Sequence, residues 1–117
     1  MALIIKSNSP QELLSKIKKA IDSKSIVTWS YDSEGDFTHS PEQWKTKAWL
    51  SPKFVNDKLQ FGLIGNKNEN TTKLVYALYH GRFAEMLLTH FDKDIDGIEI
   101  TSMPTSIDII TTEVTNP

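Results

Sequence analysis

The sequence predicts an α+β fold: a two-layer sandwich in which a mainly antiparallel sheet of four to six strands carries two helices on one face. Two segments show apolar residues at helical spacing, and several short segments are rich in β-branched and aromatic residues. Two amphipathic helices need an apolar surface to cover, and one face of a sheet supplies it. We expect residues 1–117 to form one α+β domain, with 104–117 as either a last strand or an ordered tail.

The chain begins with a predicted strand followed by a predicted helix. Residues 2–7 contain a short apolar run, which indicates the strand. Ser9, Pro10 and Glu12 then make a helix-start signal, with Ser9 as the N-cap, Pro10 in the first helical position and Glu12 completing a capping box. One apolar face follows at helical spacing and consists of Leu13, Leu14, Ile17, Ala20 and Ile21.

The middle of the chain predicts further strands. Residues 25–31 and 73–80 are rich in β-branched and aromatic residues, and 44–51 alternates between small or apolar and charged or aromatic side chains. The strand predicted at 58–65 should pair with 44–51 as a hairpin, with Asn56-Asp57 in the turn between them. Residues 32–43 are polar and rich in turn formers, so we expect a long loop there.

A second helix is expected from Gly81 to Phe91, because apolar residues in this segment share one helical face. The strand predicted before it would run into the helix at His80-Gly81, which places Arg82 in the first turn. Backbone N–H groups at a helix start, helped by a cationic side chain, can bind an anion. A histidine nearby can serve as an acid or base. His80 and Arg82 are therefore candidate anion-binding residues. In the alternative interpretation, Gly81 only changes the chain direction and Arg82 is solvated.

An aspartate-rich turn follows this helix. Asp92, Asp94 and Asp96 precede Gly97 in the order of the first half of a calcium-binding loop. The twelfth position, which should supply a bidentate glutamate, is Met103. We therefore interpret the turn as a helix end in which Gly97 has a positive φ before a strand begins. Weak cation binding by the three aspartates is left open.

The composition argues against several classes of protein. The chain has 38% hydrophobic and 24% charged residues, a net charge of −2 and no cysteine. It therefore has no disulfide or thiolate metal site, and nucleic-acid binding is disfavoured because such binders usually carry a basic excess. No apolar run approaches the ~20 residues of a membrane span, and the N-terminal residues lack signal-peptide features. We expect a cytoplasmic protein without a membrane partner, metal or cofactor.

Aromatic residues predict the binding surface. Three tryptophans, Trp29, Trp44 and Trp49, fall within a short stretch of this small chain. On the predicted strand Trp49 shares a face with Lys45 and Lys47, and a half-exposed tryptophan between lysines suits protein contact. Trp44 at the strand entrance and Phe37 on the preceding loop would extend that surface. The alternative is that Trp49 faces the helices while its lysine neighbours reach around to solvent.

The favoured interpretation is a small non-enzymatic module that binds another protein, as bacterial inhibitors, antitoxins and immunity proteins do. The first alternative is a small enzyme or anion-binding domain that uses His80 and Arg82, with His39. The second is a nucleic-acid-binding module that uses Trp49, Lys45 and Lys47. No nucleophile or phosphate-loop motif occurs, so we assign no catalytic residue. A homo-oligomer is compatible with the same sequence.

Overall fold

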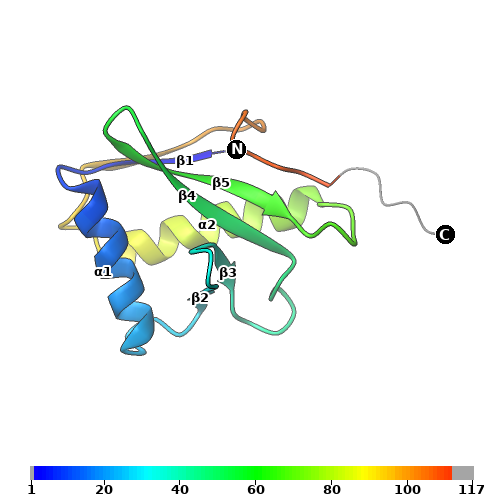
Figure 1. The fold of residues 1–117 in the computed structure, drawn as a ribbon, viewed down its shortest axis with the longest axis horizontal. Helices are drawn as coiled ribbons and strands as arrows, with labels where there is room; N and C mark the ends of the chain where they lie inside the picture. Colours follow the sequence, from blue (N-terminus) through cyan, green and yellow to red (C-terminus); the bar gives the residue numbers. More distant parts are fainter. Residues whose placement is uncertain (1, 112–117) are drawn as a thin grey trace.

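The computed structural model describes residues 2–111 and contains a six-stranded antiparallel sheet and two helices (Figure 1). The strands lie in the order β2-β3-β4-β5-β1-β6. This arrangement confirms the predicted α+β fold class. The element bounds are β1 (Ala2–Lys6), α1 (Pro10–Asp22), β2 (Trp29–Tyr31), β3 (Phe37–His39), β4 (Ala48–Val55), β5 (Lys58–Gly65), α2 (Lys73–His90) and β6 (Gly97–Ile100).

Both helices cover the same face of the sheet, and the core lies between the two layers. Alternate residues along each strand point to this side, as the two-residue period of a strand requires. Figure 1 shows α2 running behind β4 and β5. The buried apolar side chains form one cluster, to which β1 gives Leu3 and Ile5, β5 gives Leu59, Phe61 and Leu63, α1 gives Leu13 and Ile17, and α2 gives Tyr79, Phe83 and Leu87.

The hairpin of β4 and β5 forms at the predicted turn. Asn56 and Asp57 have φ values of 51° and 61°, and Val55 pairs with Lys58 across the turn. Two-residue hairpin turns favour Asn and Asp because these residues tolerate positive φ. Pro52 lies inside β4 rather than in the connection, opposite Phe61. Proline is tolerated at this position because β4 pairs with β3 earlier in the strand, at Leu50 and Phe37. By Pro52 that side of β4 is an edge of the sheet, where no backbone N–H is needed for pairing.

The strand predicted over residues 73–80 is wrong, since α2 runs without a break from Lys73 to His90. Short windows of aromatic and β-branched residues resemble a strand, and the helical period is visible only over the whole segment. Gly81 also suggested a boundary, because glycine in a helix interior costs about 1 kcal/mol relative to alanine. The buried face of the helix consists of Tyr76, Tyr79, His80, Phe83, Met86 and Leu87.

The loop predicted over residues 32–43 contains a strand, β3, that the sequence did not indicate. The side chain of Asp32 accepts hydrogen bonds from the backbone N–H groups of Glu34 and Asp36, both at 3.0 Å. Gly35 has a φ of 82°, which completes the turn between β2 and β3. A strand of three residues is too short to show a period. The strand predicted over 44–51 begins only at Ala48, after Thr46 with a φ of 59°.

The C-terminal part of the described chain adds to the sheet. β6 begins at Gly97, which pairs with Lys6 and does not have the positive φ that we expected of it. Ile109 then forms a parallel bridge with Ile64, and the side chain of Asp108 accepts a hydrogen bond of 2.7 Å from the N–H of Leu63. The segment 104–111 is thus anchored along β5. Residues 112–117 of the predicted strand or tail lie outside the described residues.

The two helix starts differ in how they are capped, and the predicted capping box is wrong. Ser9 makes no side-chain cap bond, and its own N–H donates to Ser7 Oγ at 3.2 Å. Thr72 at the start of α2 does cap, since its Oγ1 accepts a hydrogen bond of 3.1 Å from the N–H of Val75.

We therefore expect Thr72→Ala to lower the free energy of unfolding by about 0.5–2 kcal/mol, the usual cost of losing a cap. Ser9→Ala should cost less than about 0.5 kcal/mol, because it removes no cap bond. Urea denaturation of both variants measures the difference. Equal losses would show that the assignment of the caps is incorrect.

Candidate functional site

The candidate site is the face of the sheet opposite the helices, which we call the helix-free face. Within residues 2–111 both helices lie on the other side. The strand registers place the same alternate residues of each strand on this face. The side chains that they bring here are Ile4, Lys6, Trp49, Ser51, Lys53, Val55, Lys58, Gln60, Ile64 and Glu99.

An apolar row crosses this face. Trp49 pairs with Ile64, and Ile64 forms the bridge with Ile109, so the three side chains lie side by side. Trp49 and Ile64 are half-buried, and Ile109 is 64% exposed. The chain passes over β5 beside this row, because a Cβ added at Gly62 would overlap the backbone of Ile107. The row is therefore apolar and partly open to solvent.

Basic side chains lie on the same face as the apolar row, toward the β4–β5 turn at its other end. Lys6, Lys53 and Lys58 lie on the helix-free face, and among its strand residues Glu99 carries the one opposing charge. The whole chain has a net charge of −2. The helix-free face is therefore locally positive on an acidic protein, a distribution that attracts an acidic partner.

Trp49 lies on the helix-free face, so the alternative in which it faces the helices is wrong. Its predicted lysine neighbours are not on the strand. Lys45 and Lys47 lie in the turn before β4, and Lys47 Nζ is 3.3 Å from Glu69 Oε2. The alternation that placed all three on one strand face is broken by the turn. The predicted binding roles of Lys45 and Lys47 stay predictions.

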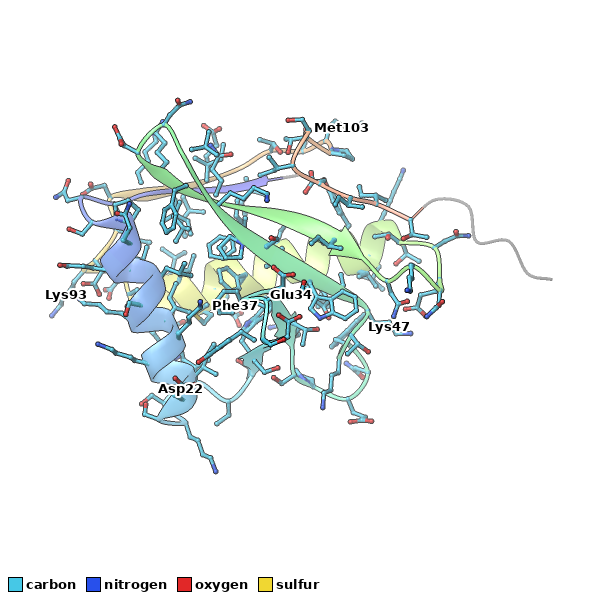
Figure 2. The ribbon with its side chains drawn as sticks, in the orientation of Figure 1. Asp22, Glu34, Phe37, Lys47, Lys93 and Met103 are labelled. Carbon is cyan, nitrogen blue, oxygen red and sulfur yellow. The ribbon has the colours of Figure 1, made fainter. Side chains whose placement is uncertain are left out.

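Phe37 and Trp44 do not extend this surface. Phe37 is fully buried in β3, with its ring centroid 5.7 Å from that of Phe83 and 5.8 Å from that of Phe61. Figure 2 shows Phe37 in the centre of the molecule and Lys47 at its periphery. Trp44 is half-buried in the turn before β4, and its backbone oxygen accepts a hydrogen bond from Tyr79 on the helix side. The predicted surface role of Phe37 is therefore wrong in this fold.

His80 and Arg82 lie in the middle of α2, so the anion site predicted at a helix start is not formed there. His80 is buried, and its Nδ1 lies 2.7 Å from the backbone oxygen of Tyr76. Arg82 is exposed and pairs with Glu85, with 3.3 Å between Nη1 and Oε2. The sequence prediction joined His80 and Arg82 through a helix start at Gly81. Because α2 is continuous at this point, that reason for a shared binding site no longer holds.

The aspartate-rich turn is used in packing. Asp94 pairs with Lys16 of α1 at 2.8 Å, and the N–H of Asp96 donates to the backbone oxygen of Lys6 at 2.7 Å. Across the described part of the chain, no three or more His, Cys, Asp or Glu residues are grouped so as to hold a metal ion. The turn ties the end of α2 to α1 and β1.

His39 is the residue whose environment the sequence did not reveal. It is 6% exposed, and its ring centroid lies 4.6 Å from that of Trp29. Its Nδ1 is buried without a hydrogen-bond partner among residues 2–111. Burial lowers the pKa of His39 below its ordinary value of 6.5, and Arg82 lowers it further, whereas the Thr28 backbone and Glu85 oppose the change. His39 is therefore held neutral near pH 7.

This pKa shift predicts acid sensitivity. Below about pH 6.5 the unfolded chain binds a proton at His39, whereas the folded chain, with its lower pKa, binds that proton less readily. The free energy of unfolding should therefore decrease as the pH decreases. The fall ends once the pH has passed the lowered pKa of the folded state. His39→Phe keeps a ring beside Trp29 and should flatten this part of the profile. Denaturation of both proteins from pH 7 to pH 5 tests the prediction, and parallel profiles would contradict it.

Comparison with known proteins adds no relative. No family model, curated protein or solved structure matches the chain. Neither helix of residues 2–111 has the length and apolar character needed to cross a membrane. Function is therefore inferred from this chain's own residues.

Proposed function

We propose that this protein binds another protein through the helix-free face, with Trp49 at the centre of the contact. The observation that carries the proposal is the row of Trp49, Ile64 and Ile109, which is apolar and reaches solvent on a sheet face that neither helix covers. Tryptophan is enriched among the few residues that supply most of the binding energy of an interface. A rigid sheet presents it at little conformational cost.

The charge of this face selects an acidic partner. Lys6, Lys53 and Lys58 lie toward the β4–β5 turn, at the other end of this face from the apolar row, and such charges orient a partner and speed its association. Pairing of this face with a second copy would bring like lysine-rich surfaces together, which disfavours self-association through it. A different protein with an acidic surface fits better than a homodimer.

A nucleic acid is the second acidic ligand to consider. Sequence-tolerant binding of single strands uses several aromatic rings as stacking platforms along a basic groove. Among the strand residues of the helix-free face, Trp49 is the one aromatic side chain, and its neighbours are aliphatic. The net charge of −2 also opposes binding to a polyanion. These features favour protein over nucleic acid.

Paired capture experiments test the proposal. Wild type, Trp49→Ala and Val27→Ala would be immobilised and exposed to extract from the source cells, before and after nuclease treatment. Val27 is a suitable control because it is 70% exposed between α1 and β2, away from the helix-free face. We expect an acidic protein retained by wild type and Val27→Ala and lost with Trp49→Ala. Identical retention by all three, or retention that nuclease abolishes, would overturn the proposal.

A further inference from the structure

The outward face of α2 is apolar and open to solvent. A surface helix usually exposes charged side chains, as α1 does with Lys16 and Lys19. On α2 the outward side chains include Leu74 and Leu88, which are 64% and 58% exposed. A helix that is apolar on all sides is normally buried on all sides, whereas the fold of residues 2–111 buries α2 along one side. An exposed apolar surface of this kind indicates a contact with another molecule.

The outward residues of α2 follow the spacing of a helix-packing seam. They recur at alternating steps of three and four residues, as the contact positions of two packed helices do. The seam consists of Leu74, Ala77, Gly81, Ala84 and Leu88. The leucines stand at equal distances from Gly81, and the small residues between them let another backbone approach closely. A shallow groove of about 380 Å³ on this side is lined by α2 residues alone.

The charges at the two ends of α2 are the reverse of those that stabilise a single helix. Lys73 stands in the first turn, which contains no acidic residue, and Asp92 follows the last turn. A helix start favours negative charge and a helix end positive charge, so both residues are unfavourably placed within one chain. Both side chains are exposed. Arg82 and Glu85 pair with each other and leave no net charge beside the seam.

An antiparallel second copy of α2 satisfies these features together. It brings the start of one helix beside the end of the other, so Lys73 of each copy lies near Asp92 of the other. A parallel copy would instead bring Lys73 beside Lys73 and align the two helix dipoles unfavourably. The seam reads nearly the same in both directions from Gly81, as a twofold interface requires.

We propose that the outward face of α2 binds a second copy of this chain and forms a twofold dimer of antiparallel α2 helices centred on Gly81. Leu74 of each copy packs on Leu88 of the other, and the glycines meet at the centre. The helix-free faces of both copies lie on the other side of their sheets and stay open. The dimer therefore does not depend on the proposed protein contact, and it presents that contact surface twice.

Sedimentation equilibrium of the whole chain tests the association. The 18-residue α2 is about 27 Å long and about 10–12 Å wide, so its face is smaller than the roughly 800 Å² that each partner of a standard interface buries. We therefore expect a weak dimer with a Kd of about 0.1 mM. A wild type that stays monomeric at about 1 mM, well above this Kd, would overturn the proposal.

Gly81→Gln blocks the close approach without harming the fold. Glutamine favours a helix more than glycine does, and no atom of another element of residues 2–111 lies within 4 Å of a Cβ at Gly81. We expect this variant to be at least as stable as wild type in urea and to sediment as a monomer at about 1 mM, the concentration at which wild type dimerises. Wild-type dimerisation by Gly81→Gln would contradict the placement of Gly81 at the centre.

Exchange of the end charges tests the antiparallel orientation. Lys73→Glu and Asp92→Lys should each weaken the dimer about fivefold, because each change makes two attractive contacts repulsive. The double variant reverses both charges and should return to within about threefold of the wild-type Kd. Lys19→Gln removes a charge from the exposed side of α1 and should dimerise like wild type. A double variant that dimerises no better than the single variants would contradict the contact between Lys73 and Asp92.

Cysteine variants test the register, because the chain has no cysteine of its own. Gly81→Cys should form a disulfide with its second copy under mild oxidation, since the two positions meet at the centre. Leu74→Cys alone should react slowly, because its two copies lie about 21 Å apart along antiparallel helices. A mixture of Leu74→Cys and Leu88→Cys should give the mixed disulfide. Fast self-linking of Leu74→Cys, or of the exposed control Val27→Cys at the rate of Gly81→Cys, would contradict the antiparallel dimer.

Discussion

Replacing Phe37 by alanine should lower the free energy of unfolding by about 3–5 kcal/mol, the usual cost of removing a buried aromatic side chain. Phe37 is fully buried and pairs with Leu50 across the sheet. Its ring lies against those of Phe61 and Phe83, which come from β5 and α2. The substitution would leave a cavity where both layers meet, and rigid neighbours would fill little of it.

Phe54 provides the matched control, because it is 48% exposed near the end of the β4–β5 hairpin. Phe54→Ala removes the same atoms from a site that has less to lose and should cost less than about 1.5 kcal/mol. Urea denaturation measures both variants. Similar losses for Phe37→Ala and Phe54→Ala would contradict the placement of β3 in the core and would restore Phe37 as a surface residue.

Gly62→Ala should have the second largest effect and cost about 1–3 kcal/mol, as overpacking does. A Cβ at Gly62 would overlap the carbonyl oxygen of Ile107 and lie 2.9 Å from its carbonyl carbon. Backbone atoms cannot rotate away as a side chain does, so the segment that carries Ile107 must move. The bonds from Ile109 N–H to Leu63 O and from Gly65 N–H to Ile109 O, both 2.7 Å, should then weaken.

Gly81→Ala is the control for this prediction. Apart from its chain neighbours and the nearby backbone of α2 itself, no heavy atom of residues 2–111 lies within 4 Å of a Cβ built at Gly81, so this change should stabilise the protein by about 0.5–1 kcal/mol. Hydrogen exchange should also be faster at Ile109 and Gly65 in Gly62→Ala than in Gly81→Ala. Unchanged exchange and unchanged stability in Gly62→Ala would show that residues 105–111 do not pack against β5 as described.

Local signals in the sequence predicted part of the fold well. The start of α1 follows from Pro10, and the hairpin turn follows from Asn56-Asp57, because these residues restrict their own backbone angles. The strand predicted at 73–80 failed because its aromatic content outweighed a helical period that needs the whole of α2 to be seen. The sequence did not predict β3 for the opposite reason. Three residues are too few to show a period, and their place in the sheet depends on partners distant in the sequence.

The candidate site was harder to predict than the fold. Trp49 could be singled out because it stands in an alternating strand, but its neighbours Ile64 and Ile109 come from pairings that the local sequence does not reveal. The sequence placed Phe37 on a loop, whereas in the structure it lies on a strand and is buried. The outward apolar face of α2 was not predicted, because residues 73–80 were assigned to a strand.

The most direct test of protein binding through the helix-free face is the Kd of the captured partner, measured by calorimetry for wild type, Trp49→Ala and Val27→Ala. We predict that Trp49→Ala weakens binding by about 2 kcal/mol or more, roughly thirtyfold in Kd, while its denaturation midpoint stays close to that of wild type. Val27→Ala should bind like wild type. An unchanged Kd for Trp49→Ala would contradict the proposal that the partner contacts the helix-free face.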